Sequence, residues 1–144
     1  MNAVQYTVRF IQSMSQFPLC RHCIGVAVVK SSRCEDCTKQ GVNGAPYLLK
    51  NYGLLPEYYI TGTELQSLGW KWGKAPSKYA PGKMAMMGIY RNDNGHLPSA
   101  PGRVWYEADI NYTDGRRNAQ RVLWSNDGLV FVTYDHYQTF VEVV

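Results

Sequence analysis

From residue 86 to its carboxyl end, the chain alternates short segments that favour β-strands with turns. Five segments are rich in β-branched or aromatic residues, and turn-forming Asn, Gly and Asp residues separate them. They cover residues 86–91, 103–109, 120–125, 129–134 and 138–143. Because no helical pattern lies between these segments, they predict a five-stranded antiparallel sheet.

A short helix is predicted at residues 47–52, well before the sheet. Pro46 precedes it, and proline is favoured in the first turn of a helix, where its missing N–H is not needed. Gly53 follows it, and glycine is the usual residue just past a helix end. The residues that flank this segment therefore define both of its ends.

Residues 61–70 predict a second helix. Thr61 and Thr63 are both candidates for its N-cap, and Gly69 is the candidate stop. Residues 71–83 have no period and predict a loop with at most one helical turn. Since helices precede strands along the chain, the predicted fold class is α+β, with the helices packed on one face of the sheet.

Length and composition limit the chain to one ordinary core with a small appendage. It has 144 residues, 45% of them apolar and only 18% charged, and its formal net charge is +4 without a polybasic run. This charge is compatible with a polyanionic partner. No apolar run approaches the roughly 20 residues needed to cross a bilayer. The first 18 residues do not resemble a secretory signal, so we expect a cytoplasmic protein without a membrane partner.

All four cysteines lie near the amino terminus, in two CxxC pairs separated by ten residues. They are Cys20, Cys23, Cys34 and Cys37. Each pair can present two thiolates to one tetrahedral ion, which predicts a closed, structural zinc site. Two disulfides, or four separate buried thiols, are the alternatives, and a reducing compartment disfavours the first.

The turn-rich stretch at residues 41–46 divides the chain into a four-cysteine zinc-binding module, residues 1–44, and a second domain, residues 45–144. The module is predicted to be a small zinc-ribbon-like subdomain. Such a module can bind nucleic acid, bind a protein or brace its neighbour, and the sequence leaves the three roles open.

Charged residues gather between positions 103 and 121. On a strand, Glu107 and Asp109 share one face, and three arginines follow across a turn. These groups can form an ion-pair network that ties a hairpin together, which is the better interpretation for Asp109. For Glu107 with Arg117, Arg121 and His136 a chemical interpretation competes, because a base, an acid and two guanidinium groups suffice to cleave RNA.

Several separate sequence blocks support the chemical interpretation. They are LPEYYIT at 55–61, LGW at 68–70, APGK at 80–83, GHLP at 95–98, EADINYT at 107–113, GRRN at 115–118 and DHYQTF at 135–140. In these blocks and their order, residues 45–144 resemble the barnase-like, guanyl-preferring bacterial ribonucleases. The resemblance implies the microbial ribonuclease fold and an endoribonuclease that acts on single-stranded RNA.

The resemblance also implies a role for each matching residue. Glu107 would be the general base that takes the ribose 2′-hydroxyl proton, and His136 the general acid that protonates the departing 5′-oxygen. Arg117 and Arg121 would stabilise the phosphorane, and Tyr137 would contact the substrate. The product would be a 2′,3′-cyclic phosphate, and no catalytic metal is implied.

Two positions depart from the family pattern. A lysine important for catalysis in the family is replaced by Gly62, and the aspartate that accompanies it by Gly88. Arg116, Lys71 or Lys83 could supply the missing cation.

The loop expected to bind the base also differs from the family. It contains Asn92, Asp93 and Asn94 as candidate substrate-binding residues, with Asn94 where relatives have a glutamate. Because an amide offers only one acceptor oxygen where a carboxylate offers two, a preference for guanine is in question.

The sequence thus predicts an intracellular endoribonuclease whose zinc module serves targeting or stability. The alternatives are a catalytically attenuated RNA- or protein-binding factor on a ribonuclease scaffold, and an interaction module that targets a host complex through the zinc subdomain. An active nuclease would endanger its own cell, and the relatives suggest an acidic proteinaceous inhibitor as a further partner.

Overall fold

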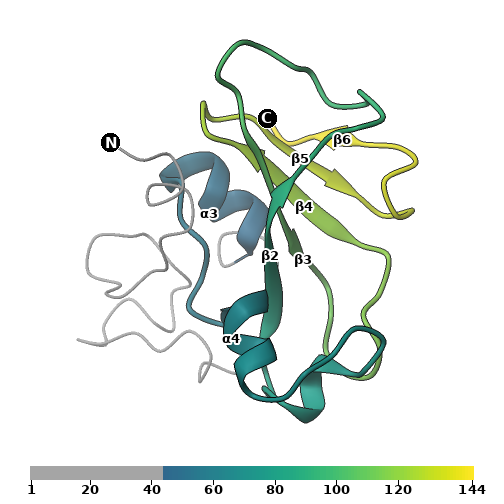
Figure 1. Cartoon of the computed structure of the whole chain (residues 1–144). Helices are drawn as coiled ribbons and strands as arrows, with labels where there is room; N and C mark the ends of the chain where they lie inside the picture. Colours follow the sequence, from purple (N-terminus) through teal and green to yellow (C-terminus); the bar gives the residue numbers. More distant parts are fainter. Residues whose placement is uncertain (1–43) are drawn as a thin grey trace, which may run out of the picture.

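A computed structural model describes residues 44–144 of the protein (Figure 1). The helical elements are α3 (Ala45–Tyr52), α4 (Gly62–Ser67) and the 3-10 turn η3 (Pro76–Lys78). The strands are β1 (Tyr59–Thr61), β2 (Met84–Tyr90), β3 (Trp105–Asp109), β4 (Arg121–Ser125), β5 (Val130–Thr133) and β6 (Val141–Glu142). They form one sheet in the order β1-β2-β3-β4-β5-β6. The α+β class predicted from the sequence is confirmed, but the helices do not share one face of the sheet as predicted. Helix α3 packs on the face of Met84 and Met86, whereas α4 packs against Ala85, which points to the other face.

The prediction of five strands, all antiparallel, is wrong at one edge of the sheet. The additional strand β1 pairs parallel with β2, with Tyr59 opposite Met84 and Thr61 opposite Met86, while the other pairings are antiparallel. Three residues are too few to display the two-residue period of a strand. The same pairing explains why β2 begins at Met84, two residues before the predicted start.

Local sequence signals define both helices. The N–H of Gly53, whose φ is 68°, donates to the carbonyl of Leu49 at 3.0 Å and ends α3. The hydroxyl of Thr61 accepts the N–H of Glu64 at 3.1 Å, which makes Thr61 the N-cap of α4. Helix α4 ends at Ser67, three residues earlier than predicted, and Gly69 follows with a φ of 102°.

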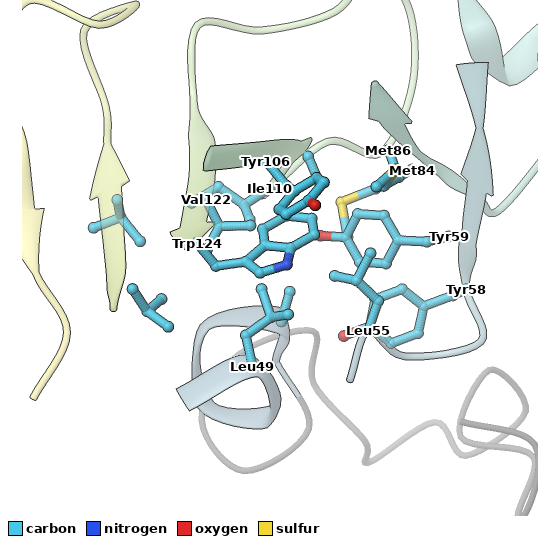
Figure 2. Close-up of a cluster of buried hydrophobic side chains, with 14 of the residues drawn as sticks. Leu49, Leu55, Tyr58, Tyr59, Met84, Met86, Tyr106, Ile110, Val122 and Trp124 are labelled. Atoms are coloured by element: carbon cyan, nitrogen blue, oxygen red, sulfur yellow. The ribbon is translucent and has the colours of Figure 1, made fainter. Parts of the chain in front are cut away.

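The core lies between α3 and one face of the sheet. Its side chains include Leu49 from α3 and the stacked pair Tyr106 and Trp124, whose ring centroids are 5.8 Å apart (Figure 2). Because side chains alternate along a strand, the residues between these core positions point to the other face. There Trp105 and Leu123 form a second apolar cluster. This second face also carries the charged residues of β3 and β4.

The last predicted strand, residues 138–143, shortens to β6 because its beginning forms a turn. The carboxylate of Asp135 accepts the N–H groups of Gln138 and Thr139 at 3.1 and 2.9 Å. A backbone amide bonded to a local carboxylate is not available to a neighbouring strand. The predicted strand is therefore wrong over residues 138–140.

Two predictions concern metals and membranes. Cys20, Cys23, Cys34 and Cys37 lie outside the described residues, so the zinc module stays a prediction. Within residues 44–144 no group of three or more His, Cys, Asp or Glu side chains could hold a metal ion. In the same part of the chain, no helix has both the length and the apolar character needed to cross a membrane.

Candidate active site

Glu107 lies in the middle of β3 on the face opposite α3. Its strand neighbours are Leu123 on β4 and Gly88 on β2, so an apolar side chain lies on one side and no side chain on the other. Burial raises the pKa of the Glu107 carboxyl above its ordinary value, and a hydrogen bond from Tyr137 with the charges of Arg121 and Arg117 opposes this rise only in part. A raised pKa makes the carboxylate a stronger proton acceptor.

Tyr137 is the immediate partner of Glu107. Its hydroxyl donates a hydrogen bond to Oε1 of Glu107, and its ring stacks on Tyr90 with centroids 5.2 Å apart and planes inclined by 16°. Burial and the nearby Glu107 charge raise the pKa of Tyr137 well above its ordinary value. The phenol therefore stays a neutral hydrogen-bond donor at any physiological pH.

Asp109 clamps two arginines beside this pair. It accepts two hydrogen bonds from Arg117, Nε to Oδ2 at 2.8 Å and Nη2 to Oδ1 at 2.7 Å, and its own side chain is fully buried. Arg121, directly opposite on β4, brings its Nε within 3.1 Å of Oδ1, although this nitrogen is not aligned for a hydrogen bond. The ion-pair network predicted for Asp109 is confirmed.

The two guanidinium groups are held by hydrogen bonds to neighbouring oxygens. Nη1 of Arg121 donates to the carbonyls of Asn118 and Gln120, each at 2.7 Å. Burial alone would lower the pKa of Arg117, but the hydrogen bonds and charge of Asp109 outweigh it and raise the pKa overall. Two fixed positive charges therefore lie next to Glu107, as stabilisation of a developing phosphorane requires.

His136 is presented by a turn that Asp135 organises. Besides the two amides of the turn, the Asp135 carboxylate accepts the hydroxyls of Thr133 at 3.0 Å and Thr139 at 2.6 Å. The hydroxyl and amide of Thr139 lower the pKa of Asp135 to about 2, with smaller contributions from Thr133 and Gln138. This carboxylate is thus charged under all functional conditions and keeps the turn closed.

The imidazole of His136 emerges from this turn into solvent. The backbone N–H of His136 donates to the carbonyl of Ala119 at 3.1 Å, and its φ of 57° is in the left-handed region. Its ring centroid is 4.9 Å from that of Tyr137. Tyr137 consequently contacts Glu107 through its hydroxyl and His136 through its ring, and joins the candidate base to the candidate acid.

The loop expected to bind the nucleobase is closed by its own side chains. The amide of Asn92, which has a φ of 54°, donates from Nδ2 to the Leu97 carbonyl at 2.9 Å and accepts the Leu97 N–H at 3.1 Å. Asn94 accepts the N–H of His96 at 3.1 Å. Asp93 is exposed and lies 3.5 Å from Arg91. The predicted residues are thus together in one loop, with the side chains of Asn92 and Asn94 engaged in shaping it.

Two of the side chains around the candidate site were not among those predicted from the sequence. Tyr90 stacks on Tyr137, and Nδ1 of His96 lies 3.4 Å from the Tyr137 carbonyl. Tyr90 on β2 pairs with Trp105 on β3, and Trp105 lies on the same face of the sheet as Glu107. The alternation of side chains along the two strands could therefore have placed Tyr90 beside the candidate site. Lys83, one expected substitute for the missing lysine, instead donates to the Glu57 carbonyl at 2.9 Å.

Comparison with known proteins adds an independent line of evidence. A family model described as ribonuclease matches residues 50–144. The chain is 46% identical over 100 residues to a ribonuclease of Heyndrickxia coagulans, and the match covers 69% of this chain and 91% of that protein. Ribonucleases of Bacillus intermedius and Bacillus pumilus are also 46% identical over 100 residues, but the match covers 61% of their length.

Proposed function

Since this chain belongs to the microbial, barnase-like ribonuclease family and is an endoribonuclease, we propose that it cleaves single-stranded RNA by transesterification. In this reaction the ribose 2′-oxygen forms a bond to the adjacent phosphorus and the bond from phosphorus to the 5′-oxygen breaks. The products are a 2′,3′-cyclic phosphate on one fragment and a 5′-hydroxyl on the other. The single observation that carries the proposal is that Tyr137 contacts both Glu107 and His136.

Glu107 acts as the general base in this proposal. It takes the proton of the 2′-hydroxyl as the oxygen attacks, and its raised pKa supports this role. Because Tyr137 already donates to Oε1, the 2′-hydroxyl approaches the other oxygen or displaces the phenol. The burial that raises the Glu107 pKa also keeps water from competing with the ribose hydroxyl.

His136 acts as the general acid. Its exposed ring gives its proton to the departing 5′-oxygen, and histidine is the residue type that can donate a proton near neutral pH. Arg117 and Arg121 stabilise the negative charge that develops on the phosphorane oxygens. Since Asp109 fixes Arg117 before RNA binds, little reorganisation accompanies the reaction.

The principal test uses purified full-length protein and RNA in the presence of EDTA. Wild type is expected to yield fragments ending in a 2′,3′-cyclic phosphate, and Glu107→Gln and His136→Ala to lose about 10²- to 10⁴-fold in rate. Equal cleavage by all three proteins would indicate a contaminating nuclease. RNA binding without cleavage by wild type would support the attenuated binding factor, which the glycine at position 62 favours.

Residues 1–44 are proposed to form the zinc module, with Cys20, Cys23, Cys34 and Cys37 as ligands that stabilise the module or target the enzyme to RNA or a host complex. The proposal rests on the spacing of the cysteines. We further propose that the enzyme acts in the cytoplasm and that a proteinaceous inhibitor restrains it there. One equivalent of zinc per chain, lost in Cys20→Ser and Cys34→Ser variants, is the expected result of metal analysis.

A further inference from the structure

Trp72 is a large aromatic residue exposed at the edge of the candidate active site. Of its surface, 66% is accessible to solvent, whereas its neighbour Trp70 is 2% exposed. Trp70 packs between α4 and β2 with Leu65 and Ala85, so this tryptophan is a core residue. The Trp72 ring contacts that of Trp70, with centroids 5.1 Å apart, but most of its surface stays open to solvent and is available for contact with a ligand.

Hydrogen bonds define the shape of the loop around Trp72. The N–H of Lys74 donates to the carbonyl of Lys71 at 3.0 Å, which closes a tight turn with Trp72 at its second position. Gly73 occupies the third position with a φ of 88°, a conformation that favours glycine in such a turn. The indole N–H of buried Trp70 donates to the Lys74 carbonyl at 2.9 Å. The turn therefore holds Trp72 in place without burying it.

Trp72 forms one wall of a pocket of about 250 Å³ whose charged side chains are all cationic. The residues that line it are Trp70, Trp72, Gly73, Lys74, Arg116 and Arg117. Pockets that enclose a whole drug-sized ligand measure roughly 300–1,000 Å³, so this one suits a single planar group with an anionic neighbour. A nucleotide of single-stranded RNA, with its flat base and its phosphate, has this chemistry.

Arg117 connects this pocket to the reaction centre. Its guanidinium lies over the ring of Trp72, with Cζ 5.6 Å from the ring centroid, while its edge is bonded to Asp109. A ligand that stacks on Trp72 therefore lies beside the arginine that faces the scissile phosphate in the proposed mechanism. The pocket therefore adjoins the proposed reaction centre.

We propose that Trp72, with Lys74 and Arg116, forms a subsite that binds a nucleotide flanking the cleaved linkage, the base stacked on the indole and its phosphate held by the cations. This inference rests on the proposed function, since it extends the same RNA path. Base stacking on an aromatic side chain is tolerant of sequence, so the subsite adds affinity for longer RNA without adding base preference.

The test compares two substrates that share one cleavable linkage. One is a dinucleoside monophosphate, and the other is a hexanucleotide with deoxyribose at every position except the cleaved one. Trp72→Ala is expected to lower kcat/KM for the hexanucleotide about tenfold and to leave the dinucleoside unchanged, while Trp72→Phe retains most of the activity. Equal losses on both substrates would overturn the subsite, because Trp72 would then act only by positioning Arg117.

A charge-matched pair of variants tests the cationic part. Lys74→Ala is expected to lower kcat/KM several-fold for the hexanucleotide only, whereas Lys50→Ala removes the same charge from α3, on the other face of the sheet, without effect. Equal effects of the two variants would reduce the proposal to general attraction between the protein and RNA. Thermal unfolding of each variant checks that the fold is intact.

Failure of the proposed function is recognised separately, by wild type that cleaves neither substrate. In that case, fluorescence anisotropy with a labelled, fully deoxy hexanucleotide measures binding without chemistry. A Kd that rises about tenfold in Trp72→Ala still supports the subsite, and an unchanged Kd overturns it. If Trp72 binds a protein instead, the Kd for the oligonucleotide is the same in wild type and Trp72→Ala, and the subsite proposal is overturned.

Discussion

The hydroxyl of Tyr137 donates a hydrogen bond to Oε1 of Glu107, so the candidate base is already engaged before RNA arrives. The same tyrosine ring lies 4.9 Å from the ring of His136, centroid to centroid. A single side chain thus contacts both groups that exchange protons with the substrate in the proposed mechanism. This relationship allows the protonation of Glu107 to be altered without a change to Glu107 itself.

Tyr137→Phe is expected to shift the acid limb of the pH profile of kcat/KM toward higher pH. The Tyr137 hydrogen bond lowers the pKa of Glu107, and its loss leaves the raising effect of burial less opposed. A base with a higher pKa loses its proton only at higher pH, so activity on the acid side of the pH optimum falls by roughly 3- to 10-fold. An unshifted limb, with a uniform loss at all pH values, would show that Tyr137 acts on substrate binding alone.

Glu107→Gln is expected to abolish most activity and yet to stabilise the fold at neutral pH. Because burial raises the carboxyl pKa in the folded state, ionisation of Glu107 opposes folding. The contribution of Glu107 to stability is therefore most favourable below the unfolded pKa of about 4.3 and is lost as the pH rises through the folded value. The amide cannot ionise but can still accept the Tyr137 hydrogen bond.

Urea unfolding of wild type and Glu107→Gln at pH 4 and pH 7 measures this difference. The free energy of unfolding of the variant should exceed that of wild type at pH 7, and the advantage should disappear near pH 4. A variant less stable than wild type at pH 7 would contradict the sign of the Glu107 pKa shift.

Asp109→Asn is expected to cost both stability and activity. It leaves Arg117 and Arg121 without the buried carboxylate that compensates their charges, a loss of about 3–5 kcal/mol in the free energy of unfolding. Asp127→Asn is the matched control, because it breaks the ion pair with Arg103 at a half-exposed carboxylate. Such a pair is worth about 0–1 kcal/mol. Similar losses for the two variants would show that Asp109 is not the centre of the network.

Most of the sheet could be predicted because its strands carry their own signals. Alternation along β3 correctly placed Glu107 and Asp109 on one face, and Arg121 lies directly opposite Asp109. Strand β1 could not be predicted, because its three residues form a strand only through their pairing with β2. The predicted last strand failed at its start because the hydrogen bonds of the Asp135 turn override the strand propensity of Gln138 and Thr139.

The candidate site was predictable as a set of residues but not as an arrangement. The sequence pointed to Glu107, Arg117, Arg121 and His136, yet it gave no indication that Tyr137 bridges the first and the last. The position of Trp72 beside Arg117 also escaped prediction, because the loop that carries it has no period. Contacts between loops depend on tertiary packing, which local sequence patterns do not record.

Gly62→Lys is expected to raise kcat, since it restores the cation that the family carries at this position. The backbone of Gly62 has no positive φ, and the closest atom to an added Cβ would be Cε of Met87, at 3.3 Å, the mobile end of a flexible side chain. Gly88, where the accompanying aspartate is missing, has open space around it, so no clash opposes the new side chain from there. One fixed group that faces developing charge is worth about 10²- to 10³-fold in rate. Gly62→Gln is the control, because its side chain is nearly as long but carries no charge. A similar rise in kcat for both variants would show that replacement of a flexible glycine, and not the added cation, accelerates the enzyme.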